Sequence, residues 1–156
     1  MQCDTIENKL KFLGFELPEV PVPVAEYLPA KKVGELVYCS GQGPIRNGRP
    51  VYIGRVGAEV SLTEAYKAAQ LCVLNCLAAV KAVIGSLDAI EEIVQVRGFV
   101  NSAPGFYDQP KVIDGASQLL VKLFGNRGQH ARVAVGTFAL PMNIPVEIEM
   151  VVRVRV

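Results

Sequence analysis

An arginine and the chain's single histidine stand at the start of an apolar stretch in the sequence QHARVAVG, residues 129–136. Arg132 precedes a run that predicts a core strand, and burying a guanidinium without a partner is costly. The partner can be Glu147 or Glu149, in a structural salt bridge. Alternatively, it is the carboxylate or phosphate of a ligand, which a planar guanidinium binds through two hydrogen bonds. His130 is either a base or a structural residue beside a glycine-rich loop.

Two further places combine polar residues with a backbone that a ligand can approach. Glu147 is either a solvated strand residue or a carboxylate that orients or deprotonates a water molecule. In the stretch CSGQGP, residues 39–44, glycines after a strand allow a ligand to reach the backbone N–H and C=O groups. The same residues are compatible with an ordinary turn before a hairpin.

The four cysteines are Cys3, Cys39, Cys72 and Cys76, and we expect them to be reduced in a cytosolic chain. Cys72 and Cys76 share one face of a predicted helix, either as a metal or redox pair or as small apolar core residues. A zinc site has few other ligands available, because the chain has one histidine. We therefore predict core cysteines and neither a metal nor another cofactor.

The composition indicates a single domain over residues 1–156, with a net charge of +1, 51% hydrophobic residues and 20% charged residues. Near-neutral charge without a long basic run argues against a nucleic-acid partner. The start, MQCDTIENKLKF, lacks a basic segment followed by an apolar one, and the apolar stretch LCVLNCLAAV contains Asn75. We therefore expect a cytoplasmic protein without a membrane partner.

Periodicity and turn signals predict the elements that position these residues. Residues 1–30 form an N-terminal extension: a short helix over 4–14, then an extended segment with prolines at 18, 21, 23 and 29. A strand is predicted over 36–40. Asn47-Gly48 then indicates a hairpin whose returning strand covers 51–56.

The second half of the chain predicts two helices and three strands. A helix over 62–84 begins with a capping box formed by Ser61 and Glu64. The elements that follow are a strand over 91–101, a helix over 110–124, a strand over 132–140, and a strand with alternating apolar residues over 146–156.

This order of elements predicts an α+β fold in which two helices pack on one face of a mixed β-sheet. The other face carries small, polar and apolar residues, and no further helix is predicted to cover it. Another subunit is the natural cover, so we expect an oligomer.

Five motifs, taken together and in order, resemble those of the YjgF/RidA family, also called the L-PSP endoribonuclease family, over roughly residues 24–155. The motifs are Tyr27, Ser40-Gly41-Gln42, Ala131-Arg132, Leu140-Pro141 and Val146-Glu147-Ile148-Glu149. The N-terminal extension, NSAPGF at 101–106 and GQHARVAVG at 128–136 are similar to a longer subgroup of that family.

The resemblance implies a chorismate-mutase-like fold and a homotrimer with clefts between adjacent subunits. It also implies cofactor-independent hydrolysis of reactive enamine and 2-imino acid intermediates to 2-oxo acids and ammonia. Arg132 would then bind the substrate carboxylate, and Glu147 would hold the attacking water. The backbone of Gly41, beside Ser40, would accept from the imine nitrogen, and Tyr27 would close the cleft.

Asp114 stands nearest to a position where typical members of the family have an asparagine that lines the site. A carboxylate there would repel an anionic substrate or favour a cationic one. Two other functions stay open: a non-catalytic trimer that binds a small carboxylic acid as a sensor or chaperone-like partner, and an endoribonuclease. Few aromatic residues and the lack of a histidine pair or basic stripe argue against the ribonuclease.

Overall fold

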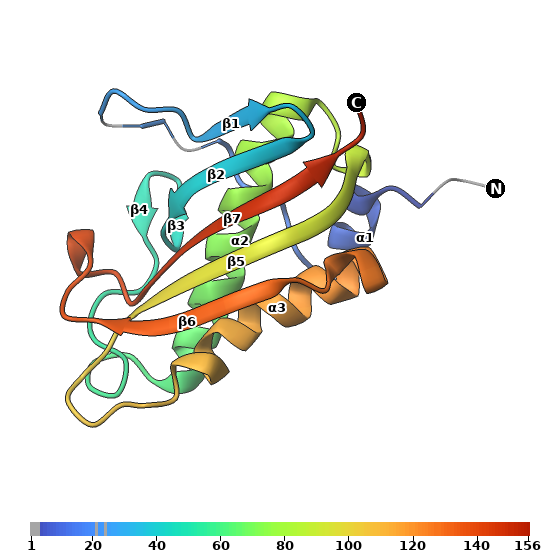
Figure 1. Ribbon diagram of the computed structural model, residues 1–156. Helices are drawn as coiled ribbons and strands as arrows, with labels where there is room; N and C mark the ends of the chain where they lie inside the picture. Colours follow the sequence, from blue (N-terminus) through green and yellow to red (C-terminus); the bar gives the residue numbers. More distant parts are fainter. Residues whose placement is uncertain (1–3, 21, 24) are drawn as a thin grey trace.

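A five-stranded sheet with the strand order β1-β2-β7-β5-β6 is the main feature of the computed structural model, which describes residues 4–20, 22–23 and 25–156 (Figure 1). β5 and β6 are parallel, and the other neighbouring strands are antiparallel, so the predicted mixed sheet is confirmed. The strands are β1 (Ala30–Val33), β2 (Leu36–Gln42), β5 (Ile90–Asn101), β6 (Ala131–Thr137) and β7 (Val146–Val154).

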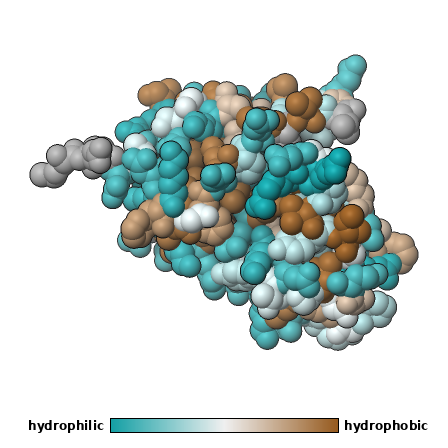
Figure 2. Space-filling view, turned by 180° about the vertical axis from the view of Figure 1, so that it is seen from behind, coloured by the Kyte–Doolittle hydropathy of each residue, from teal (hydrophilic) through white to brown (hydrophobic). Residues whose placement is uncertain are grey.

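Two long helices, α2 (Leu62–Ile84) and α3 (Gln109–Phe124), cover one face of this sheet and lie behind it in Figure 1. The predicted capping box is present, because Ser61 accepts from the Glu64 backbone and the Glu64 side chain accepts from the Ser61 backbone. A third, short helix, α1 (Ile6–Phe12), packs against α3 through its buried apolar residues. The helix-covered side, seen in Figure 2, is hydrophilic with scattered hydrophobic groups.

The core lies between the sheet and the two long helices. Along β7 every second residue is buried, as the alternation predicted: Val146, Ile148, Met150, Val152 and Val154. On α2, burial raises the pKa of the Cys72 and Cys76 thiols well above the ordinary value. These cysteines are therefore inert core residues, as predicted, whereas Cys3 lies outside the described residues.

Helix α2 has the length and mean hydropathy, 1.5, of a membrane-spanning helix, although the sequence was not expected to contain such a segment. In the fold, 67% of the most apolar 18-residue stretch of this helix is buried. Its apolar residues pack on β2, β7 and α3. The apolar character of α2 is thus explained by its place as the central helix of the core.

The strand prediction differs from the structure at the hairpin and at β1. The hairpin is only β3 (Ile45–Arg46) and β4 (Arg49–Pro50), joined by Asn47-Gly48 with positive φ at both residues, and residues 51–56 form no strand. β1, an edge strand after the proline segment, was not predicted. The described part of that segment contains no helix or strand, as expected, whereas Pro21 lies outside the described residues.

β6 is also different from the core strand that the apolar run after Arg132 predicted. It ends at Thr137 rather than at residue 140, and it is an edge strand in which most residues are exposed. Val133 is 41% exposed and Val135 is 40% exposed. Both are in register with residues of β5 on the face of the sheet that no helix of the described residues covers. This face is called the open face below.

Candidate functional site

A bulge in β2 shapes the open face of the sheet. Cys39 is opposite Met150 and Gln42 is opposite Ile148, so Ser40 and Gly41 together face a single residue of β7. Bulges of this kind re-aim side chains and are frequent beside active sites.

The bulge also fixes the chain segment that carries Tyr27. The Ser40 hydroxyl donates to the Leu28 carbonyl oxygen at 2.6 Å, and the Ser40 backbone N–H donates to Pro29 at 2.8 Å. Tyr27 comes directly before Leu28 in the chain. It is 52% exposed and lies at the end of the sheet near β1. Tyr27 is therefore tied to the bulge through its neighbours in the chain.

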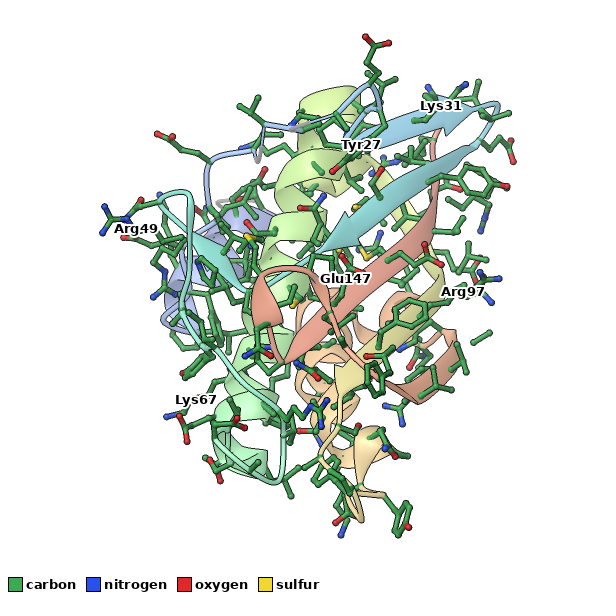
Figure 3. All side chains as sticks on the ribbon, turned by 90° about the vertical axis from the view of Figure 1, so that its left-hand side faces the viewer. Tyr27, Lys31, Arg49, Lys67, Arg97 and Glu147 are labelled. Atoms are coloured by element: carbon green, nitrogen blue, oxygen red, sulfur yellow. The ribbon has the colours of Figure 1, made fainter. Side chains whose placement is uncertain are left out.

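Glu147 extends from β7 on the open face, next to the bulge (Figure 3). Gly41 makes room for it, because a Cβ atom at position 41 would lie 3.1 Å from the Glu147 carboxyl carbon. Partial burial raises the pKa of Glu147, and the charge of Glu149 raises it further. A carboxylate of this kind accepts a proton more readily than an exposed one, as a general base requires.

A cavity of about 630 Å³ lies on the same face, between the β1 end and β5. Tyr27, Tyr38 and Lys31 line one side, and an ion pair between Arg97 and Glu149, 3.2 Å apart, lines the other. Figure 3 shows Tyr27 and Lys31 near β1, with Arg97 and Glu147 further along the sheet. Ser40 lines the cavity as well.

Arg132 lies on the other face. In the parallel pair β5–β6 it is in register with Val96, a buried residue on the helix side of the sheet. Its Nη1 donates to Asp114 Oδ1 at 2.8 Å and to Ser117 Oγ at 3.2 Å, and both residues belong to α3. Of the two alternatives for Arg132, the structural salt bridge with Glu147 or Glu149 is wrong, because β6 is adjacent to β5 and not to β7.

The predicted site residues thus form two groups in one chain. The open-face group consists of Tyr27 and Ser40, which line the cavity, and of Gly41 and Glu147, which lie together at the bulge but are not among the residues that line it. The edge group consists of Arg132 and Asp114. The sheet separates the two groups, so a single chain does not bring Arg132 and Glu147 to one ligand.

Ser117 is a site residue that the sequence did not predict, and His130, for which two roles were open, lies beside it. His130 Nδ1 is 2.6 Å from the Gly128 carbonyl oxygen, and Nε2 is 2.8 Å from Ser117 Oγ. Burial lowers the pKa of His130, the hydrogen bond to Gly128 opposes this, and the nearby charge of Arg132 lowers it further. The spacing of Asp114 and Ser117, one helical turn apart, was the available signal.

No group of three or more histidine, cysteine, aspartate or glutamate side chains that could hold a metal ion occurs among residues 4–20, 22–23 and 25–156. The open-face group offers a carboxylate, hydroxyls and backbone groups, and the neighbouring cavity adds the charges of Lys31, Arg97 and Glu149. The chemistry at the edge is that of a guanidinium paired on one side only.

Residues 7–152 match the sequence family described as "YjgF/chorismate_mutase-like, putative endoribonuclease". Protein TCP17 of Trypanosoma cruzi is 36% identical over 151 residues, which cover 96% of this chain and 94% of that protein.

Solved structures share the whole fold. Atu1372 of Agrobacterium tumefaciens, a protein with unknown function, is 44% identical with a TM-score of 0.91, covering 98% of this chain and 94% of that one. A "putative endoribonuclease" from Shewanella oneidensis is 34% identical with a TM-score of 0.92, covering 96% and 99%. The YjgF gene product of Escherichia coli, at 19% identity and a TM-score of 0.66 over 88% and 94%, shares the fold.

Proposed function

Because the chain belongs to the YjgF/chorismate mutase-like family, we propose that it hydrolyses 2-imino acids and their enamine forms to 2-oxo acids and ammonia. The reaction takes place without a cofactor, in clefts between the subunits of a cytoplasmic homotrimer. The observation that carries this proposal is the division of the site: a guanidinium with one free edge on β6 and a partly buried carboxylate on β7. Two copies of the chain join these halves around one small carboxylic acid.

The chemistry needs no protein nucleophile, since the carbon of a protonated imine is already electrophilic. Arg132 binds the carboxylate of the substrate, and Glu147 removes a proton from a water molecule as its oxygen bonds to the imine carbon. The proton on Glu147 then passes to the nitrogen of the tetrahedral intermediate. The C–N bond breaks and ammonia leaves while the ionised Glu147 takes the proton of the hydroxyl group, whose oxygen becomes the carbonyl oxygen of the 2-oxo acid. Glu147 then passes this proton to water, and the carboxylate is regenerated.

Asp114 fits this reaction because its charge is balanced by Arg132 at 2.8 Å. A free carboxylate would repel an anionic substrate, whereas an ion-paired one does so much less. A protonated 2-imino acid carries a positive nitrogen beside its carboxylate. The adjacent Arg132 and Asp114 have the matching pair of charges.

Ammonia release from 2-imino acids of varied side chain, generated in situ by an amino-acid oxidase, tests the proposed reaction. We expect the protein to accelerate release over spontaneous hydrolysis, and the Arg132→Ala variant to abolish this acceleration. If the protein binds 2-oxo acids without accelerating release, it is the non-catalytic trimer instead. If the wild-type protein cleaves RNA and the Arg132→Ala variant still does so, both the proposed hydrolase and the non-catalytic trimer would be contradicted.

A further inference from the structure

A chain of hydrogen bonds extends from Arg132 away from the proposed cleft. The Gly128 carbonyl oxygen can only accept, so the hydrogen of neutral His130 is on Nδ1 and the Nε2 lone pair is free. Nε2 therefore accepts from the Ser117 hydroxyl at 2.8 Å. Ser117 Oγ in turn accepts from Arg132 Nη1 at 3.2 Å. Each of these three hydrogen bonds thus uses one hydrogen and one acceptor.

This chain of bonds determines which edge of the guanidinium is free. Nη1 has two hydrogens, and they point to Ser117 Oγ and to Asp114 Oδ1 at 2.8 Å. The Nε and Nη2 donors of Arg132 have no partner among the residues that the structure describes. Nε and Nη2 lie along one edge, which binds a carboxylate through two parallel hydrogen bonds.

The fold holds each member of the chain in place. Asp114 and Ser117 are one turn apart on α3 and face the same strand. Gly128, whose carbonyl orients His130, is packed so closely that a Cβ atom there would lie 2.4 Å from the Leu120 carbonyl oxygen. The ring of His130 is therefore anchored to a backbone that has little freedom to move.

We propose that His130 and Ser117 are positioning residues that hold Arg132 with its Nε–Nη2 edge toward the substrate carboxylate. The proposal rests on the proposed function, in which Arg132 binds that carboxylate. It assigns His130 a role other than that of a catalytic base. A histidine whose two nitrogens contact Gly128 and Ser117 has none left for water.

The test compares Ser117→Ala, His130→Ala and His130→Gln with the wild type by calorimetric titration with a 2-oxo acid, and by kcat and KM where turnover occurs. Loss of the bond that orients a charged donor should weaken 2-oxo acid binding and raise KM by roughly tenfold, with little change in kcat. The Ser117→Ala/His130→Ala double variant should bind the 2-oxo acid as weakly as either single variant, because both substitutions interrupt the same series of hydrogen bonds. His130→Gln restores an acceptor and should recover most of the affinity.

Gln118→Ala is the matched control: Gln118 is on α3 like Ser117, but its Oε1 accepts from the hydroxyl of Tyr66 on α2 and has no bond to Arg132 or His130. It should leave 2-oxo acid affinity unchanged. Binding is measured without turnover, so an effect of His130→Ala in a protein that releases no ammonia would support positioning and refute only the proposed reaction. Unchanged affinity in Ser117→Ala and His130→Ala, unchanged affinity in Arg132→Ala, or covalent labelling of Ser117 by a fluorophosphonate would overturn the proposal.

Discussion

At the scale of single residues, Arg132 either binds a ligand or stabilises the fold through its ion pair with Asp114, and the exposure of that pair distinguishes the two roles. The Asp114 side chain is 39% exposed, so it can regain water when its partner is removed. An ion pair of this exposure contributes about 1 kcal/mol or less to the free energy of unfolding. The pair therefore adds little to stability, and loss of ligand binding is the effect that distinguishes the proposed role of Arg132.

We expect Arg132→Ala to lower the free energy of unfolding by less than about 1 kcal/mol and to reduce affinity for a 2-oxo acid by roughly tenfold or more. A thermal melt and a calorimetric titration on the same preparation measure both. Asp114→Asn is the control: it breaks the ion pair but keeps the guanidinium, so its loss of affinity should be smaller. A large loss of stability with unchanged affinity would assign Arg132 a purely structural role.

Glu147 predicts a dependence of stability on pH. Burial and Glu149 raise its pKa in the fold above the ordinary 4.5, so the folded state binds the proton more tightly than the unfolded state. This contribution to stability is fully present below about pH 4.5 and is lost as the pH rises through the higher pKa of the folded state. At neutral pH the ionised Glu147 is therefore destabilising.

Glu147→Gln should accordingly raise Tm at pH 7 by about 1–2 °C, a small value because the group is partly exposed, and should leave Tm unchanged near pH 4. The same variant should still bind a 2-oxo acid but release no ammonia. Melts of both proteins between pH 4 and pH 8 check the first statement. A lower Tm for the variant at pH 7 would show that the ionised carboxylate is stabilised in the fold.

At the scale of elements, the bulge in β2 brings Glu147 to the open face. Gly41 does not have positive φ, so alanine is compatible with its backbone, but the new methyl group would lie 3.1 Å from the Glu147 carboxyl carbon. Gly41→Ala should displace the carboxylate by a few tenths of an ångström. We expect a tenfold or larger loss of kcat with a small change in Tm, because placement of the water depends on this distance.

The control for that prediction is the double variant Gly41→Ala/Glu147→Gln. If the methyl group acts through the carboxylate, it should have no further effect on kcat once Glu147 has been replaced. Equal losses in both backgrounds would mean that position 41 acts on the substrate directly.

Periodicity and capping predicted the elements that the chain covers by itself. α2 was expected from its cap and apolar stripe, and β7 from its alternation, because both bury one face within the chain. The pattern failed at β6, where Val133 and Val135 are apolar but exposed. The sequence shows that these side chains are apolar, but it does not show whether the same polypeptide or another subunit buries them.

The contacts of the site could be predicted less well than its residues. Glu147 and Glu149 were possible salt-bridge partners of Arg132 on the assumption that their strand lies beside the strand of Arg132. The crossover through α3 makes β6 parallel to β5, and β7 pairs with the other edge of β5. The partners of Arg132 are instead Asp114 and Ser117 on α3. Their spacing of one helical turn is visible in the sequence, but only the packing of α3 against β6 shows that both face Arg132.

At the scale of the whole molecule, the open face contains apolar, aromatic and charged groups without cover from the described part of the chain. Tyr38, Val133 and Val135 are each at least 40% exposed there. A face of this composition is typical of a surface that another copy buries. Such an assembly is also what the divided site requires, because the edge group of one copy would meet the open-face group of the next.

The divided site gives a prediction that only an intersubunit cleft fulfils. Arg132→Ala and Glu147→Gln should each be inactive on their own, since every cleft of the proposed homotrimer then lacks one half of the site. When both variants are co-expressed in equal amounts, a cleft is complete where the copy that donates Arg132 is the Glu147→Gln variant and the neighbour is the Arg132→Ala variant. Each condition holds with a probability of one half, so about one quarter of the clefts should be intact. Ammonia release should return to about a quarter of the wild-type rate. Mixing the two variants after separate purification, without subunit exchange, provides the background. A site within one chain would give no recovery, because each chain would still carry one of the two substitutions.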